Sequence, residues 1–424
     1  MHITSQLKAV LELLETVFDP ENKKPADDLF VNYCRSRRYI GSKDRQFIAQ
    51  YFFDILRYLN GIQKALDNQF TLINAILLFW FFKNQSFERL HEEHQYGLVL
   101  PANDVLQFLE TACVVLKENL SMVPQWTEKY FKELGPNYKL HIEALHKEAS
   151  FDIRINPFLT TRDDVLKIFK YEGIEAAKTK ISPVGLRLEQ RVALQGLDIW
   201  KKGLIEIQDE GAQIAAILCD AQQGESVLDY CAGAGGKTLL LSSLMHNKGK
   251  IIATDLYSWR LDYAKKRLKR AQAFNVQIKP LEDKKWWKRH EETFDRVLID
   301  VPCSGSGTWR RNPDMKRRFA QNDLDELLIV QQNILNTAKK YVQPKGFLIY
   351  ATCSLWNVEN QQQIEQFLKE NVDFSLVDIY DICEKNDINL QKEPSESAPG
   401  MIQLTPYEHG VDGFFVAVMK RRKI

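Results

Sequence analysis

From about residue 205 to residue 419, short apolar runs alternate with amphipathic segments. The runs have the length and composition of strands and cover residues 226–229, 251–255, 278–281, 296–300, 347–352 and 414–419. Between them, leucine and alanine recur at helical spacing over 261–271 and 324–338. Such alternation is typical of a parallel sheet whose strands are joined by crossover helices. We therefore predict an α/β fold with a mostly parallel sheet in this part of the chain.

The first 145 residues carry a helical pattern instead. Leu7, Val10, Leu11 and Leu14 follow the spacing of an amphipathic helix, and a second such run covers 45–66. The most apolar stretch, 70–82, is too short to cross a bilayer and is predicted to be a buried helix. We expect an all-helical domain over 1–145, a small α+β module over 146–204 and the parallel-sheet domain over 205–424.

Composition limits the classes of protein that fit. A length of 424 residues suggests two or three domains, and a net charge of +1 gives no global signal for a nucleic-acid partner. The seven cysteines are an odd number without Cys-x-x-Cys spacing, which argues against a disulfide framework and a zinc site. The first residues lack the pattern of a signal peptide. We expect a cytoplasmic, monomeric protein with reduced thiols, no metal ion and no membrane association.

A glycine-rich loop joins the first strand of the α/β region to a leucine-rich helix. Its glycines permit a tight turn and close approach of the backbone to a ligand. The ending Gly236-Lys-Thr resembles a phosphate loop, but that motif needs a glycine where this chain has Cys231. The next strand ends in Asp255, where a carboxylate suits hydrogen bonds to both ribose hydroxyls. Loop and acid predict an adenosine ligand such as S-adenosylmethionine; the alternative is that Asp229 and Asp255 only cap helices.

Two cysteines follow predicted strands, in the sequences Asp300-Val-Pro-Cys-Ser-Gly and Tyr350-Ala-Thr-Cys-Ser. We expect the thiols of Cys303 and Cys353 to share one pocket with Asp300. Methyl transfer to C5 of cytosine needs such a set, because a thiolate must add to C6 to make C5 nucleophilic and must leave after the C5 proton is removed. The residues alone leave open which cysteine attacks. Small buried hydrophobic residues are expected at the other cysteines outside the loop, namely Cys34, Cys113, Cys219 and Cys383.

Five motifs occur in one order over residues 205–419. They are Ile207-Gln-Asp-Glu-Gly-Ala-Gln, Leu228-Asp-Tyr-Cys-Ala-Gly-Ala-Gly-Gly-Lys-Thr, Asp300-Val-Pro-Cys-Ser-Gly-Ser-Gly-Thr-Trp-Arg-Arg-Asn-Pro-Asp, Tyr350-Ala-Thr-Cys-Ser with Glu359 and Asn360, and Asp412-Gly-Phe-Phe-Val-Ala. This set resembles the Sun/nucleolar-protein family of S-adenosylmethionine-dependent RNA cytosine-5 methyltransferases, closest to the bacterial 16S ribosomal RNA branch. The resemblance implies a class I methyltransferase, Rossmann-like sheet. Residues 1–140 resemble that branch's helical, RNA-binding domain of the NusB type.

Roles for single residues come from this resemblance. It implies that Cys353 attacks C6 and that Cys303 assists product release. It places Asp255 at the cofactor's ribose, Asp283 near the adenine and Asp300 near the methyl site. It also implies cofactor contacts from the glycine loop, at Cys231, Ala232, Gly233, Ala234, Gly235, Gly236 and Lys237.

Two positions depart from the family pattern. The family usually has proline at position 234 and often a small residue or proline at 230, where this chain has Ala234 and Tyr230. Neither change removes a chemical group that the reaction needs. Glu282 competes with Asp283 for the place near the adenine.

Basic residues follow the Pro-Cys turn directly. For Arg310, Arg311, Lys316 and Arg317 we expect contacts with RNA phosphates, since they adjoin the predicted site. The basic run at 265–270 fits a solvated helix face better. Trp309 fits either stacking on a base or packing under the turn. Because a cytosine attacked at C6 must be unstacked, the expected partner is single-stranded RNA or an extruded base.

Two other functions fit parts of this pattern. A DNA cytosine-5 methyltransferase would use the Pro-Cys thiol as its nucleophile, and the second cysteine in Thr352-Cys-Ser argues against it. A non-catalytic RNA-binding protein for ribosome assembly would keep the fold without the reactive groups. Cys303, Cys353 and Asp300 are all present, which favours an RNA cytosine-5 methyltransferase acting on ribosomal RNA.

Overall fold

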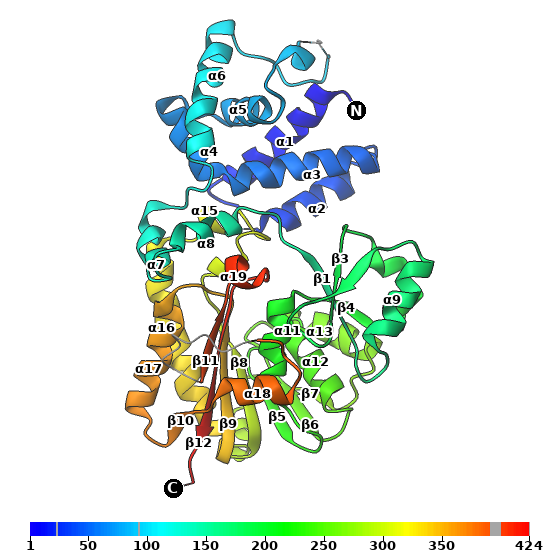
Figure 1. Ribbon diagram of the computed structural model, residues 1–424, viewed down its shortest axis with the longest axis vertical. Coiled ribbons are helices and arrows are strands. Elements are labelled where there is room, and N and C mark those ends of the chain that lie inside the picture. The colour runs from blue at the N-terminus through cyan, green and yellow to red at the C-terminus, as the bar shows by residue number, and fades with distance from the viewer. Residues whose placement is uncertain (23, 92–93, 391–399, 424) are drawn as a thin grey trace. The chain divides into compact units, whose positions relative to one another are not determined.

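Two structural units share this chain (Figure 1). The computed structural model describes residues 1–424 apart from 23, 92–93, 391–399 and 424. Unit 1 comprises Met1–Glu148 and Trp309–Ala320, and unit 2 comprises Ala149–Thr308 and Gln321–Ile424. The segment Trp309–Ala320 thus belongs with the N-terminal helices, although in the sequence it lies inside the region predicted as the α/β domain.

Unit 1 is helical, as predicted. Its helices are α1 (Ile3–Phe18), α2 (Ala26–Ser36), α3 (Ser42–Arg57), α4 (Leu59–Leu66), α5 (Leu72–Asn84), α6 (Asn103–Glu118), α7 (Glu128–Lys132), α8 (Tyr138–Leu145) and α15 (Met315–Arg318). Helix α5 is the buried helix predicted at 70–82, and it packs against α1, α4 and α6. The run predicted as one helix over 45–66 is divided, because Tyr58 leaves the helical conformation between α3 and α4.

The segment Trp309–Ala320 is built into the packing of unit 1. The ring of Trp309 meets the ring of Phe131 edge-on, with 5.6 Å between the centroids. Asp314 accepts a hydrogen bond of 3.2 Å from the backbone N of Ala26, the first residue of α2. A carboxylate in this place satisfies one of the N–H groups that a helix start leaves unpaired.

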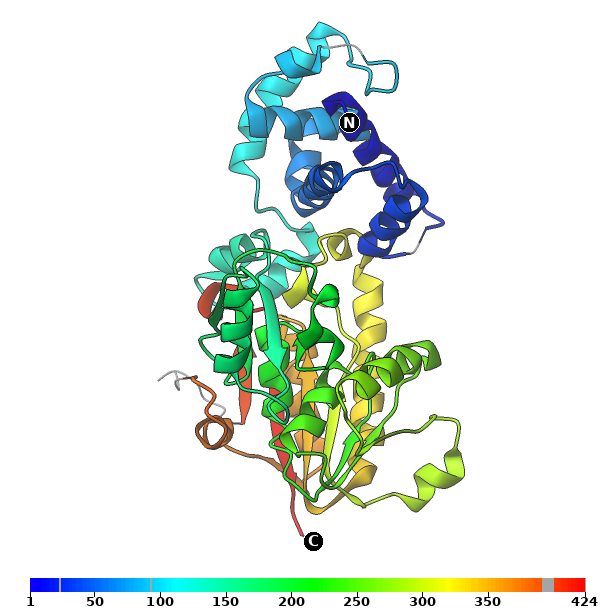
Figure 2. The same ribbon diagram turned by 90° about the vertical axis from the view of Figure 1, so that its right-hand side faces the viewer.

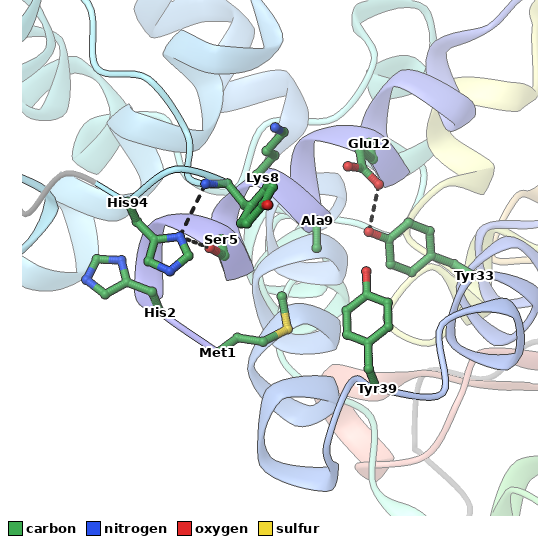
Figure 3. Close-up of a pocket in the computed structure, with 10 residues that line it drawn as sticks. Met1, His2, Ser5, Lys8, Ala9, Glu12, Tyr33, Tyr39 and His94 are labelled. Atoms are coloured by element: carbon green, nitrogen blue, oxygen red, sulfur yellow. Dashed lines mark hydrogen bonds between the residues drawn. The ribbon is translucent and has the colours of Figure 1, made fainter.

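Unit 1 also contains a pocket of about 450 Å³ beside α1 (Figure 3). Lys8 and Glu12 of α1 line it together with Tyr33, Tyr39 and His94. The hydroxyl of Tyr33 donates to Glu12 over 2.9 Å. The lining residues include neither a cysteine nor the glycine-rich loop, so this pocket is not the site of the predicted methyl transfer.

Unit 2 begins with a small antiparallel sheet in the order β2-β3-β1-β4. The strands are β1 (Phe151–Ile155), β2 (Ala176–Lys178), β3 (Gly185–Leu188) and β4 (Ile205–Ile207). Helix α9 (Arg162–Tyr171) starts at Thr161, whose hydroxyl accepts from the backbone N of Asp164. The mixed α+β pattern predicted here is confirmed.

The main sheet of unit 2 has the strand order β10-β12-β9-β8-β5-β6-β7, with β11 paired to β12. Its strands are β5 (Ser226–Asp229), β6 (Lys250–Ala253), β7 (Val276–Ile278), β8 (Phe294–Asp300), β9 (Val342–Thr352), β10 (Phe374–Leu376), β11 (Met401–Leu404) and β12 (Phe414–Arg421). Strands β5 to β9 pair in parallel, whereas β10, β11 and β12 pair antiparallel at one edge. The predicted mostly parallel α/β sheet is confirmed.

Helices cover both faces of this sheet, as the two views in Figures 1 and 2 show. Leu298 and Ile349 pack on the face that holds α11 (Glu210–Ile217) and α12 (Gly236–Leu244). Their neighbours Val297 and Leu348 pack on the opposite face, toward α16 (Gln321–Ala338) and α17 (Gln361–Glu370). Because both faces are buried, the central strands are apolar throughout, which is the pattern that made them visible in the sequence.

The remaining helices of unit 2 are α10 (Asp198–Lys201), α13 (Ser258–Arg270), α14 (Lys284–Arg289), α18 (Ile379–Lys385) and α19 (Pro406–His409). Helix α13 packs beside α12, as Figure 1 and the contacts between them show. Within the described part of the chain, no helix is both long and apolar enough to cross a membrane.

Candidate active site

Two neighbouring parallel strands bring the predicted cysteines together. Strands β8 and β9 pair with Asp300 opposite Ala351, so their carboxyl ends lie at the same edge of the sheet. Cys303 follows the first strand and Cys353 follows the second, and their Sγ atoms lie 3.4 Å apart. Both are free, partly exposed thiols. The expected shared pocket is therefore present.

The turns that carry the cysteines are held to each other through their backbones. The N–H of Gly307 donates to the carbonyl of Cys353 over 3.0 Å, and the N–H of Gly413 donates to the carbonyl of Gly307 over 2.9 Å. A Cβ atom on Gly307 would lie within 2.5–2.7 Å of the backbone of Gly413. Only glycine allows this approach, which keeps the Cys303 turn against the Cys353 turn.

A buried carboxylate, Glu359, joins the same two turns. It accepts from the backbone N of Ser304 over 2.8 Å, from the Ser304 hydroxyl, from the Ser354 hydroxyl and from the amide of Gln331 over 3.1 Å. Burial raises the pKa of Glu359, and the four donors oppose that rise. Ser304 and Ser354 each follow one of the cysteines, so this single side chain fixes the relative position of both thiols.

The pKa of the Cys303 thiol is strongly shifted. The hydrogen bond with Cys353 raises the pKa of Cys303 well above its usual range, and burial and neighbouring negative charge raise it further. Cys303 is therefore a neutral S–H group at pH 7, able to donate to the sulfur of Cys353.

An ion pair lies beside the thiols. Nζ of Lys237, from the glycine loop, is 2.5 Å from Oδ2 of Asp300. Burial lowers the pKa of Lys237, but Asp300 outweighs this through its charge and hydrogen bond, and Cys353 adds to the effect, so the net pKa is raised. Lys237 was predicted as a cofactor contact; here its ammonium group is held by Asp300 within electrostatic reach of Cys353.

The glycine loop has the backbone that its sequence predicts. Gly233 and Gly235 adopt positive φ angles of 54° and 78°, and α12 begins at Gly236. A Cβ atom on Gly233 would meet no atom within 4 Å, so the loop borders open space. The N–H of Gly233 donates to Oδ2 of Asp255 over 2.9 Å, which ties the loop to the end of β6.

Asp229, at the end of β5, has unused hydrogen-bonding capacity. Its Oδ2 accepts from the hydroxyl of Thr238 over 2.6 Å, while the buried Oδ1 has no partner among the described residues. Burial raises the pKa of Asp229 to about 7. An unpaired carboxylate oxygen, the open space at Gly233 and the acid at Asp255 together fit a polar adenosine ligand lying across the ends of β5 and β6.

Cys231 and Asp283, two other residues predicted to contact the cofactor, lie in different surroundings. Cys231 is partly buried at the start of the loop, where burial raises its pKa well above its usual range, and it remains a thiol that lines the loop. The exposed side chain of Asp283 accepts from the backbone N of Trp286 and so caps α14. A capping role explains Asp283 without a ligand.

The four basic residues predicted to contact RNA belong to unit 1. Arg310 and Lys316 are only 5% and 6% exposed. Nζ of Lys316 donates to the carbonyl of Arg57 over 2.5 Å, and Arg317 donates to the carbonyl of Val17. Contacts with phosphates do not fit the burial of Arg310 and Lys316. Trp309 is buried as well, in agreement with the packing alternative.

Sequence reasoning missed the structural roles of several residues in the site. Glu359 was noted only as part of a motif, while Gln331, Ser304 and Ser354 were given no role. The available signal was a carboxylate six residues after Cys353, in the short turn Asn357–Glu359 that follows β9, since an acid buried there needs donors. Its donors at 304 and 331 are too distant in the sequence to be paired with it by spacing.

Comparisons with known proteins agree with this geometry. The family described as "16S rRNA methyltransferase RsmB/F" matches residues 216–420, and its ferredoxin-like domain matches residues 123–195. The chain is 33% identical over 344 residues to ribosomal RNA small subunit methyltransferase B of Pasteurella multocida, covering 78% of this chain and 73% of that protein. It is 29% identical over 412 residues to the enzyme of the same name from Shewanella oneidensis, covering 90% and 92%.

Solved structures show the same fold. A methyltransferase homolog protein from Pyrococcus horikoshii shares 26% identity at a TM-score of 0.60, covering 71% of this chain and 96% of that chain. The protein PH0851 reaches a TM-score of 0.76 at 22% identity, over 99% of each chain. The predicted methyltransferase fold and S-adenosylmethionine as cofactor are thereby confirmed, and the chain belongs to the RsmB/F family of 16S rRNA methyltransferases.

Proposed function

We propose that this protein transfers a methyl group from S-adenosylmethionine to C5 of a cytosine in RNA, with 16S ribosomal RNA as the substrate. The observation that carries the proposal is the 3.4 Å separation of the Cys303 and Cys353 sulfurs beside the ion pair of Lys237 and Asp300. Cytosine C5 is not a nucleophile by itself, and a thiol at C6 is the means of making it one. The names of the relatives from Pasteurella multocida and Shewanella oneidensis support the choice of RNA.

Cys353 is the attacking residue in this proposal. In this role its sulfur would accept a hydrogen bond from the Cys303 thiol 3.4 Å away, and the charge of Lys237 acts on it. Addition of the Cys353 sulfur to C6 places electron density on C5. Asp300, the last residue of β8, would hold the N3/N4 edge of the base while Lys237 balances its charge.

The cofactor supplies the electrophilic methyl group for C5. Asp255 and Asp229 would hold its polar groups, and the backbone of the glycine loop would approach it closely. A base, which solvent water can supply, then takes the C5 proton, and the C5–H electron pair forms the double bond between C5 and C6. The bond between C6 and the Cys353 sulfur breaks at the same time, and its electron pair returns to that sulfur. The Cys303 thiol then stabilises the leaving thiolate by the hydrogen bond that already links the two sulfurs.

Substitution of each cysteine tests these roles. The Cys353→Ala variant should lose methyl transfer entirely, because no thiolate reaches C6. The Cys303→Ala variant should still attack but release slowly, so a covalent protein–RNA adduct should accumulate. The assay incubates each variant with S-adenosylmethionine and ribosomal RNA from cells lacking this protein, then applies bisulfite sequencing and denaturing gels. Cys34→Ala, which removes a buried thiol of unit 1, serves as the control.

Two results would contradict the proposal in different ways. An adduct formed by the Cys353→Ala variant, together with normal turnover by the Cys303→Ala variant, would reverse the two roles. Absence of any cytosine methylated by the unaltered protein would exclude cytosine C5 as the acceptor.

A further inference from the structure

Three aromatic side chains lie exposed just after Asp255, at the start of α13. Tyr257, Trp259 and Tyr263 are 49%, 57% and 60% exposed. The opposite face of α13 packs inward through Leu261, Ala264 and Leu268. Aromatic rings carry a large apolar area, and several exposed together are unusual where no partner covers them. Since the helix is already anchored by its other face, folding alone does not account for these rings.

The rings form one ordered group. Trp259 and Tyr263 are one helical turn apart, with centroids 6.2 Å apart in an edge-to-face arrangement. The guanidinium of Arg260 lies 4.9 Å from the centroid of Tyr257 and 5.4 Å from that of Trp259. Its Nη1 atom is 4.0 Å from Oδ2 of Asp255. These contacts restrict the rings, which reduces the entropy that a stacking ligand would lose on binding.

The charged residues of α13 are mainly basic. Lys266 and Lys269 are exposed on the same helix, while Lys265 pairs with Asp262 over 2.9 Å. The arginines of this helix behave differently, since Arg267 and Arg270 both turn inward to the buried carboxylate of Glu206. The basic run at 265–270 is thus divided into structural arginines and solvent-facing lysines.

The position of this group relates it to the candidate active site. Helix α13 follows the carboxyl end of β6, and the strand order β8-β5-β6 separates that end from the Asp300 end of β8 by two strand spacings. Two spacings amount to about 10 Å. The rings therefore lie at the same edge of the sheet as the thiols, within reach of nucleotides next to a bound target base.

We propose that Tyr257, Trp259 and Tyr263 form a stacking platform for unpaired RNA bases that flank the target cytosine, with Lys266 and Lys269 near the phosphates. The inference rests on the proposed function, because it takes RNA as the substrate. Aromatic faces bind successive bases without regard to sequence, and neighbouring cations follow the backbone. Bases held on the platform stay out of a helix, which keeps the adjoining cytosine accessible to Cys353.

Binding of a short RNA that contains no cytosine tests the platform apart from the reaction. The probe is a fluorescein-labelled 12-mer of uridine, and an abasic 12-mer of the same charge is its partner, both measured by anisotropy with the full-length protein. Loss of one stacked base is worth about 1–3 kcal/mol, so Trp259→Ala should weaken uridine binding by about 5- to 150-fold. Trp259→Phe should retain most of the affinity, and the abasic probe should respond little to either change.

The matched control is Tyr171→Ala, which removes a 91% exposed tyrosine of unit 2 from α9. Its uridine affinity should equal that of the unaltered protein. Three results would overturn the platform: unchanged uridine binding by Trp259→Ala, an equal loss for the abasic probe, or a changed oligomeric state of that variant. Loss of S-adenosylhomocysteine binding with RNA affinity intact would also overturn it and make the rings part of the cofactor site.

The outcome separates this inference from the proposed reaction. If the unaltered protein methylates cytosine but Trp259→Ala binds the uridine 12-mer just as tightly, only the stacking platform is refuted. A protein that shows the expected binding pattern but methylates no cytosine defeats the proposed reaction and leaves the platform standing.

Discussion

At the scale of single residues, Glu359 has a role that a charge count does not reveal. Its two oxygens receive four hydrogen bonds, and three of the donors belong to Ser304 and Ser354, the residues next to the two cysteines. Every donor requires an acceptor on the carboxylate. An amide in its place would turn an N–H group toward at least one donor. The hydrogen bond to that donor would be lost, and the thiol that it positions would be displaced.

We therefore predict that Glu359→Gln lowers kcat for methyl transfer by about 100-fold, the loss expected for displacement of a reacting group by about 1 Å. Binding of S-adenosylhomocysteine, measured by calorimetry, should be unchanged because the cofactor loop does not contact Glu359. The control is Glu365→Gln on the exposed face of α17, which should retain full activity. A Glu359→Gln variant with normal kcat would remove the carboxylate from the positioning of the thiols.

The residues of the site could be predicted only in part from the sequence. Asp300, Cys303 and Cys353 stand in local motifs at strand ends, so their convergence followed from the parallel sheet alone. The pairing of Lys237 with Asp300 joins residues 63 positions apart, and no local spacing encodes it. The predicted phosphate contacts at 310–317 relied on nearness in sequence to Cys303, and the burial of Arg310 and Lys316 does not fit such contacts.

At the scale of secondary-structure elements, the junction of the two thiol-bearing turns depends on one close backbone contact. Gly307 and Gly413 approach each other where the turn after β8 meets the start of β12. A methyl group at either position has no space, and relief requires the turns to separate. Separation would break the hydrogen bond from Gly307 to the Cys353 carbonyl and lengthen the distance between the sulfurs.

Gly307→Ala should therefore destabilise unit 2 by about 1–3 kcal/mol, the range for overpacking, and should lower methyl transfer more than Glu359→Gln does. Urea unfolding and the bisulfite assay measure the two effects. Gly196→Ala is the matched control, because a Cβ atom there meets nothing within 4 Å. Equal activity of the two alanine variants would show that the turns tolerate separation.

The elements themselves were predictable where both faces are buried. Strands β5, β6, β8 and β9 are apolar on both sides and appear in the sequence as continuous hydrophobic runs. Strands β10 and β11 were missed, because each has at most four residues and lies at the antiparallel edge. Their pairing with β12 depends on the fold and not on their own composition. The polar segment 384–402, which contains proline and serine, is predicted to be a loop from its composition. Residues 391–399 of it lie outside the described residues, and Met401 and Ile402 belong to β11.

At the scale of the whole molecule, the two units are not two consecutive pieces of chain. Unit 1 includes Trp309–Ala320, and with this segment the buried side chain of Lys316. Burial, with the charge of Arg57 adding to it, lowers the pKa of Lys316 to about 7. Its Nζ lies 3.0 Å from Nε2 of His146, and burial lowers the pKa of that imidazole to about 3. A neutral imidazole is the form that can accept a hydrogen bond from the amine.

The depressed pKa of Lys316 predicts a pH dependence of stability. In the unfolded chain lysine titrates near 10.4, so between about pH 7 and 10 the unfolded state binds more protons than the folded state. The free energy of unfolding should therefore rise with pH by up to about 1.4 kcal/mol per pH unit in this window. This gain in stability should be lost as the pH falls toward 7.

Urea unfolding at pH 7, 8 and 9 measures this slope, and the Lys316→Met variant isolates it. The variant keeps the aliphatic stem without the amine and does not titrate, so the stability of the unaltered protein relative to the variant should rise as the pH rises from 7 to 9. A difference independent of pH would mean that Lys316 is charged in the fold. Lys265→Met, which changes an exposed lysine of α13, should give no such trend.

The division of unit 1 into two stretches of chain also affects its synthesis. Residues 1–148 leave the ribosome first, but Trp309, Asp314 and Lys316, which complete their packing, follow only after 160 further residues of unit 2. At about 5–20 residues per second, the ribosome needs roughly ten to thirty seconds to pass from residue 148 to residue 320. During that time Phe131 and His146 lack their contacts with Trp309 and Lys316. The N-terminal helices therefore reach their final packing only after most of unit 2 has been synthesised.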